Sequence, residues 1–226
     1  EVPTKQIVME WGIFGEYHIL FNIPVALANA LSSSLIPSLT AAVASHDRKK
    51  TIGQIQTSIR FSMLIAVPCT VGMCILADPL CRMLFPGKNV MLLINLTRIG
   101  ALAVLFYSLS TISNAILQGL GHLNLPLKHS LISLVFHLAS LLLLLYAKTG
   151  IYGVVISNIL FAIMMCILNQ AAIKRHTRFS IAWGKTIGYP ILASCIMGIF
   201  AYGCYFLIHL LLPKSIEKGR IGSALS

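Results

Sequence analysis

Charged residues are scarce in this 226-residue chain. They make up 10% of it, whereas ordinary soluble domains carry about 25%. Acidic residues are the scarcest, with six Asp and Glu against 17 Lys and Arg. Hydrophobic residues reach 57%, and the mean hydropathy is +0.86. The chain has too few charges to cover the surface of a soluble domain, so we predict a membrane protein.

The usual signatures of catalytic and metal sites are also missing. The sequence holds no CxxC pair, no glycine-rich phosphate loop, no His/Glu zinc pair and no compact Ser/His/Asp arrangement. We therefore predict that the chain is not an enzyme and binds no metal and no cofactor. The basic residues mostly flank apolar segments, which indicates membrane anchoring and not nucleic-acid binding. Six cysteines in or beside apolar segments are interpreted as packing residues: Cys69, Cys74, Cys81, Cys166, Cys195 and Cys204.

Long apolar stretches occupy most of the chain. Each is close to the ~20 helical residues that cross a ~30 Å hydrocarbon core. A soluble domain would not repeat that length so many times. The sequence therefore predicts an all-α polytopic membrane bundle with six transmembrane helices, at about 19–45, 61–85, 99–118, 127–147, 151–173 and 186–212.

The segments around this bundle complete the predicted domain organisation. Residues 1–18 are mixed polar and apolar and show no signal peptide, so we expect an external loop or interfacial segment. The transmembrane bundle occupies 19–212. Residues 213–226 are expected to form an external loop leading to a further helix. Because the chain also lacks an initial Met, we expect a fragment with helices missing at both ends.

The distribution of basic residues predicts the orientation. The segments 46–60 and 174–185 hold four Lys and Arg each, and 119–128 holds one. If the helices alternate in direction, these three segments share one side, which the positive-inside rule makes cytoplasmic. In total, 9 Lys and Arg lie on this side and 8 on the other. The prediction therefore rests on the density of charge in short loops.

Polar side chains follow one face of several predicted spans, at 100° per residue. Five of them in the first span fall within an arc of about 60°. The stripes are His18, Asn22, Asn29, Ser33 and Thr40 in the first span; Tyr107, Thr111, Asn114 and Gln118 in the third; Ser130, Ser133, His137 and Ser140 in the fourth; and Gly198, Tyr202, Tyr205 and His209 in the sixth.

Two interpretations of these stripes stay open. Small and hydrogen-bonding residues let membrane helices pack together, which is the favoured interpretation for the fourth and sixth spans. Asn, Gln and His are costly in hydrocarbon unless they meet a partner or water, so the first and third spans also fit a water-filled cavity. Pro24, Pro37 and Pro68 lie inside spans, and broken helices often line transport pathways. Asp78 and Arg82 have the spacing of an ion pair on a helix.

Three segments resemble the polysaccharide-transporter branch of the multidrug/oligosaccharidyl-lipid/polysaccharide exporter superfamily, and most of all the stage V sporulation protein B family. They are YHILFNIPVALANALSSSLIPSLTAAVASHD (17–47), IRFSMLIAVPCTVGMCILADPLCRMLF (59–85) and SNAILQGLGHLNLPLKHS (113–130). The pattern extends through about residue 212. The features that carry it are the Pro24 and Pro37 spacing, Arg60 at the opening of the next helix, the Pro68 and Gly72 pair, and the AILQGLG block followed by Pro126.

This resemblance implies a transporter of 14 helices in two lobes, in which the chain looks like helices eight to thirteen. Members resemble flippases, which move lipid-linked sugars and peptidoglycan precursors to the outer leaflet by alternating access. The related lipid II flippases have a cavity-facing arginine in the helix that matches 17–40. This sequence has no Arg or Lys between residues 6 and 47. We therefore transfer no pyrophosphate clamp, and His18 is the nearest candidate for a positive charge.

The leading hypothesis is a segment of a flippase in a bacterial cell membrane. Its expected partners are a lipid-linked sugar, membrane lipid and a missing N-terminal lobe, and not nucleic acid. The alternatives are a drug or organic-cation antiporter of the same superfamily, a membrane glycosyltransferase, and a non-transporting scaffold for envelope synthesis. The residues predicted to line the substrate cavity are Glu16 near its outer mouth, His18, Asn22, Asn29, Ser33, Asn114 and Gln118.

Overall fold

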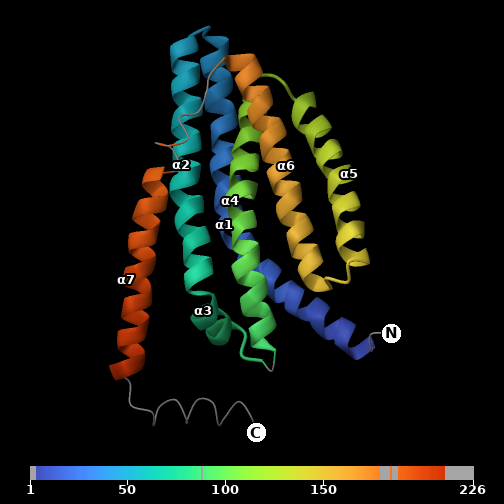
Figure 1. The fold of residues 1–226 in the computed structure, drawn as a ribbon. Helices are drawn as coiled ribbons and strands as arrows, with labels where there is room; N and C mark the ends of the chain where they lie inside the picture. The colour runs from blue at the N-terminus through green and yellow to red at the C-terminus, as the bar shows by residue number, and fades with distance from the viewer. Residues whose placement is uncertain (1–3, 88, 179–183, 185–187, 212–226) are drawn as a thin grey trace.

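The computed structural model describes residues 4–87, 89–178, 184 and 188–211, and all of its regular elements there are helices (Figure 1). No strand occurs among the described residues, which confirms the predicted all-α class. The helices of this described part are α1 (Thr4–Ala44), α2 (Arg48–Ile75), α3 (Ala77–Leu84), α4 (Val90–Gly119), α5 (Asn124–Tyr146), α6 (Ile151–Thr177) and α7 (Tyr189–Leu211).

Most of these helices are long and apolar enough to cross a membrane. In the described part of the chain, five meet both conditions: α1, α2, α4, α5 and α6. α7 covers most of the sixth predicted span, and its described apolar stretch Tyr189–Phe200 is shorter. The predicted external loop 213–226 lies outside the described residues. The chain is thus a polytopic membrane helical bundle.

The helices extend past the ends of the predicted spans. α2 already begins at Arg48, so the prediction of a loop over 46–60 is wrong for most of that segment. Asp47 caps α2 by accepting a hydrogen bond of 2.9 Å from the backbone nitrogen of Lys50. α6 likewise continues to Thr177, into the predicted loop 174–185. Hydropathy marks only the part of a helix that lies in hydrocarbon, so it does not detect polar first and last turns.

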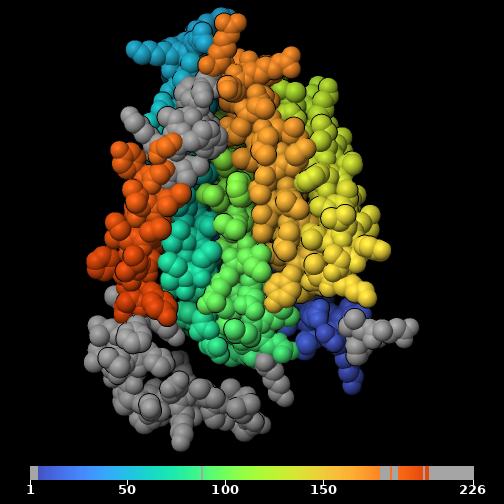
Figure 2. All heavy atoms as spheres, viewed as in Figure 1, coloured from blue at the N-terminus to red at the C-terminus, as the bar shows by residue number. Residues whose placement is uncertain are grey.

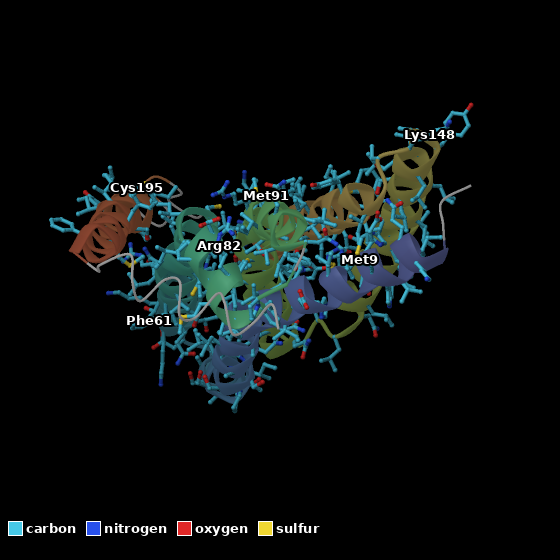
Figure 3. The ribbon with its side chains drawn as sticks, turned by 90° about the horizontal axis from the view of Figure 1, so that it is seen from below. Met9, Phe61, Arg82, Met91, Lys148 and Cys195 are labelled. Atoms are coloured by element: carbon cyan, nitrogen blue, oxygen red, sulfur yellow. The ribbon has the colours of Figure 1, made fainter. Side chains whose placement is uncertain are left out.

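α1 is too long for a single crossing. Its 41 residues correspond to roughly 60 Å at 1.5 Å per residue, about twice the hydrocarbon core. The ribbon bends, and its N-terminal part, which carries Met9, extends sideways across one end of the bundle (Figures 1 and 3). Pro24 and Pro37 lie inside α1, and proline kinks a helix by removing a backbone hydrogen bond. Residues 4–18 are therefore helical, so the loop predicted for 1–18 is wrong for its described part, while the alternative of an interfacial segment stays a prediction.

α4 is the centre of the bundle. α1, α2 and α6 pack against it, while α5 packs mainly on α6 and α7 packs on α2. Seen from the side, α7, α2, α4, α6 and α5 follow one another across the molecule (Figures 1 and 2). α1 lies on one side of this row, against α2 and α4. The largest fully buried side chains of α4 are Leu93, Ile94, Leu96, Ile112, Ile116 and Leu117.

Two glycines of α4 allow α1 to approach closely. A Cβ atom at Gly100 would overlap the ring of Tyr17. At Gly119 it would lie 2.9 Å from Cδ2 of Leu39. Small residues at such positions let membrane helices pack at short distance. Tyr17 and Leu39 are buried in this contact, so it fixes which side of α1 faces the bundle.

The helix breaks inside the second predicted span, 61–85, which is therefore not one continuous helix. α2 ends at Ile75, and the short helix α3 begins at Ala77. In α3, Nε of Arg82 lies 3.0 Å from Oδ1 of Asp78, which confirms the predicted ion pair. Arg82 lies at the same end of the molecule as the sideways part of α1 (Figure 3).

Candidate functional site

The polar residues of α1 lie on its outward side. All five are exposed, although α1 packs on two neighbouring helices. We call this surface the polar face of α1, and it consists of His18, Asn22, Asn29, Ser33 and Thr40. The sequence predicted these residues to share one side of the helix, and all five stay exposed beside α2 and α4. Thr40 also reaches α4, with its hydroxyl 3.5 Å from the carbonyl of Gly119.

Most of the polar face is hydrogen-bonded within α1. Asn22 Nδ2 and His18 Nδ1 lie 2.9 Å apart. The hydroxyl of Ser33 donates to the carbonyl of Asn29 at 2.9 Å, and the hydroxyl of Thr40 donates to the carbonyl four residues back at 2.8 Å. The side-chain amide of Asn29 has no hydrogen-bond partner among the described residues. Since hydrocarbon offers none, this amide needs water, a ligand or another protein segment.

Aromatic rings connect the polar face to the interior. His18 lies between Phe14 and Phe21, with ring centroids 6.3 and 6.1 Å away. Phe21 meets the edge of Tyr107 on α4 at 5.3 Å, and Tyr107 continues to Phe161 on α6 at 6.0 Å. Tyr107, predicted as part of the polar stripe of the third span, therefore packs between rings of two neighbouring helices. These contacts fix the position of α1 along the axis of α4.

Asn114 lies in a different part of the molecule. Its Oδ1 accepts a hydrogen bond of 2.8 Å from Nδ2 of Asn169 on α6. Oδ1 of Asn169 lies 2.8 Å from Nδ1 of His129 on α5, and Asn169 is fully buried. This network joins α4, α5 and α6, so helix packing accounts for Asn114. The structure does not bring Asn114 to the polar face of α1.

The remaining predicted site residues are also apart from the polar face. Gln118 is half-buried on α4, one turn beyond Asn114, and its side chain has no hydrogen-bond partner among the described residues. Glu16 is half-buried and lies about 120° around α1 from Asn22. Of the seven residues predicted to line the cavity, the structure thus brings together four, namely His18, Asn22, Asn29 and Ser33.

Three residues of the fourth and sixth stripes take part in helix packing. His137 Nδ1 lies 3.0 Å from the carbonyl of Ser157, which links α5 to α6. Ser133 is buried in the same contact, 3.8 Å from the sulfur of Met165. On α7, a Cβ atom at Gly198 would overlap Ile75 of α2. The side chains of Tyr205 and His209 lie outside the described part of the chain.

Comparison with known proteins identifies the family. Residues 18–216 match the family model described as "Lipid II flippase MurJ". This chain belongs to the MurJ family. The lipid II flippase MurJ of Bacillus subtilis is 29% identical over 192 residues, which are 80% of this chain and 34% of that protein. The probable lipid II flippase MurJ of Bdellovibrio bacteriovorus is 25% identical over 164 residues, which are 70% of this chain and 31% of that protein. The chain therefore spans about a third of the length of these curated relatives.

Two residues of this MurJ-family chain were not found by sequence reasoning. They are Asn169, at the centre of the buried network, and Gln170, whose Nε2 donates to the hydroxyl of Ser113 at 2.9 Å. Adjacent amides inside an apolar span are costly without partners, and this cost is the signal that could have found them. Among the described residues, no group of three His, Cys, Asp or Glu side chains is arranged to hold a metal ion.

Proposed function

We propose that this chain belongs to a flippase that moves a lipid-linked oligosaccharide or peptidoglycan precursor across the cytoplasmic membrane by alternating access, and not to an enzyme. Both curated relatives are named as lipid II flippases. Because the chain spans about a third of their length, the activity is proposed for the whole protein. A second lobe, expected from the sequence resemblance, would face this one across the pathway.

The observation that carries the proposal is the polar face of α1. Lipid offers no hydrogen-bond partner to the side chains of an exposed helix. An unpaired amide there costs on the order of several kcal/mol. Asn29 is exposed on this face and lacks a partner among the described residues. A face of this kind in a membrane-spanning helix suits a water-filled cavity. Pro24 and Pro37 interrupt the same helix, as in helices that line transport pathways.

The chemistry of the face suits a sugar more than a phosphate. Its hydroxyl and amide groups are neutral donors and acceptors, which match the hydroxyl and amide groups of a glycan. The helix has no Arg or Lys between residues 6 and 44. We infer that the other lobe supplies the positive charge for the phosphates of a lipid carrier.

The alternatives from the sequence have less support. An organic-cation antiporter needs acidic side chains in its cavity. The polar face of α1 contains none, and Glu16 of the same helix lies about 120° away from Asn22. The MurJ match also favours a lipid-linked substrate over a drug. The narrower resemblance to the stage V sporulation protein B family stays a prediction, as does the identity of the sugar.

The proposal is tested with the protein as expressed from its gene, reconstituted in vesicles with a fluorescent lipid-linked oligosaccharide. Wild-type protein is expected to expose the label to an external quencher. The double variant Asn22→Leu with Asn29→Leu is expected to slow this by at least about tenfold, because two polar contacts worth ~1 kcal/mol each are lost. The matched control is Ile23→Leu, an exposed apolar position of the same helix, which should retain the wild-type rate.

Two results would overturn the proposal. One is wild-type protein that moves no lipid-linked sugar but exports organic cations from cells. The other is a double variant that flips as fast as the Ile23→Leu control.

A further inference from the structure

A basic cleft lies at the end of the bundle opposite the sideways part of α1. It has a volume of about 370 Å³ and is formed where α1 ends, α2 begins and α6 ends. Arg48, Arg178, His46 and His176 line it, together with Thr51 and apolar side chains. This is the end that the sequence predicts to be cytoplasmic. The cleft is separate from the Asn169 network and was not found in the sequence.

The two arginines are held differently. Nη2 of Arg48 donates a hydrogen bond of 3.3 Å to the carbonyl of Thr177, which connects the start of α2 to the end of α6. A guanidinium has five N–H donors, so Arg48 keeps most of them for a ligand. Arg178 ends α6 in the left-handed conformation, with φ 52° and its backbone nitrogen 3.0 Å from the carbonyl of Lys174. Its side chain forms no ion pair among the described residues.

Histidines complete the lining. Nδ1 of His46 lies 3.0 Å from the carbonyl of Ala44. A carbonyl accepts, so Nδ1 carries a proton and Nε2 is left for another partner. His176 lies against His122, with ring centroids 4.0 Å apart.

Negative charge is nearly absent from this end of the molecule. None of the residues lining the cleft is acidic. Asp47 is the one acidic residue of this end in the described part of the chain, and its carboxylate caps α2 through the backbone of Lys50. Further basic residues surround the cleft in the adjoining turns: Lys49, Lys50, Lys174 and Arg175. A cleft with this charge selects an anion.

We propose that this cleft binds a phosphate group between Arg48 and Arg178. Planar guanidinium groups match the oxygens of a phosphate with two parallel hydrogen bonds. The phosphate could belong to a lipid head group of the adjoining leaflet or to a soluble phosphate or diphosphate, and both present the same oxygens. The site does not depend on the proposed transport activity, because it lies at the bundle end and off the polar face of α1.

The first experiment uses the protein as expressed from its gene, purified in detergent and stripped of lipid. Inorganic phosphate and pyrophosphate are titrated by calorimetry into wild type, Arg178→Gln, Arg178→Lys and Lys128→Gln. Lys128→Gln is a matched control, because it removes one positive charge from the same end of the bundle and Lys128 does not line the cleft. Arg178→Gln keeps a non-glycine residue at φ 52°, so the backbone strain is unchanged. Thermal unfolding of each variant verifies that it is folded.

We expect saturable binding of one anion per wild-type chain. Arg178→Gln should weaken it at least about tenfold, since a charge-assisted hydrogen bond contributes about 1.5–3 kcal/mol. Arg178→Lys should be intermediate, because lysine keeps the charge and loses the planar fork. Lys128→Gln should remain within about twofold of wild type, since exposed charges contribute little.

The second experiment distinguishes the two sources of the phosphate. Wild type and Arg178→Gln are placed in phosphatidylcholine nanodiscs with a minor fraction of phosphatidic acid, and the retained lipid is measured by native mass spectrometry. Retention of phosphatidic acid by wild type alone assigns a lipid head group, and binding of soluble anion without such retention assigns a free phosphate. The proposal is overturned if neither ligand binds, or if Lys128→Gln weakens binding as much as Arg178→Gln.

Discussion

The polar face of α1 and the polar stripe of α4 contain the same kinds of residue at the same helical spacing, yet they meet different surroundings. Asn29 of α1 is exposed and has no hydrogen-bond partner among the described residues. Asn114 of α4 is bonded to Asn169 in the interior of the bundle. The spacing of polar residues therefore identifies a face of a helix, while the neighbouring helices decide whether that face packs or stays open.

The largest expected effect on stability comes from the buried polar network of α4. Asn169→Leu removes the partner of Asn114 and His129 and leaves both side chains unsatisfied. We expect the free energy of unfolding to fall by roughly 3 kcal/mol, measured by thermal or denaturant unfolding in detergent. The same change at Asn29 should alter it by less than about 0.5 kcal/mol. Equal losses for Asn169→Leu and Asn29→Leu would remove the distinction between the two faces.

The next effect tests which side of α1 faces the bundle. Gly100→Ala places a methyl group where the buried ring of Tyr17 lies, and overpacking of this kind costs about 2 kcal/mol. Gly72→Ala is the matched control, because no atom of a neighbouring helix lies within 4 Å of its new methyl group, and it should stabilise α2 by about 0.5 kcal/mol. Unfolding midpoints check both variants. A neutral Gly100→Ala variant would contradict the close contact of α1 with α4.

A smaller effect is expected from the stripe of α5. His137→Leu removes the hydrogen bond of 3.0 Å to the carbonyl of Ser157 on α6. Side-chain hydrogen bonds between membrane helices contribute about 1 kcal/mol, so stability should fall by that amount. The rate of lipid flipping in vesicles should stay within about twofold of wild type. A flipping rate that falls far more than stability would show that this stripe also takes part in transport.

The smallest effect is expected outside both stripes, at the ion pair of α3. Arg82→Ala breaks the contact with Asp78, in which the arginine side chain is 60% exposed. Exposed pairs contribute about 0.5 kcal/mol or less, and salt screens them. Unfolding at low and high salt measures this contribution. A loss above about 1 kcal/mol, or one that salt does not reduce, would mean that α3 is held by more than packing.

Part of the fold and of the site could be predicted from particular residues. The apolar spans located the long helices, the spacing of Asp78 and Arg82 gave their ion pair, and the spacing of the α1 residues gave one outward face. The start of α2 at Arg48 could not be predicted from hydropathy, because a polar first turn capped by Asp47 lies outside the apolar span. The pairing of Asn114 with Asn169 depends on how α4 and α6 are aligned, and 55 residues separate the two.

The sequence by itself determined that lipid surrounds this protein. Hydrocarbon leaves a backbone no partner except itself, so runs of this length and apolarity must be helices. Only the tertiary structure decided which polar residues are buried and which are open. The reason is that Gly100 and Gly119 let one side of α1 pack closely against α4. These contacts join residues far apart in the chain, and the pattern of residues within a single helix does not predict them.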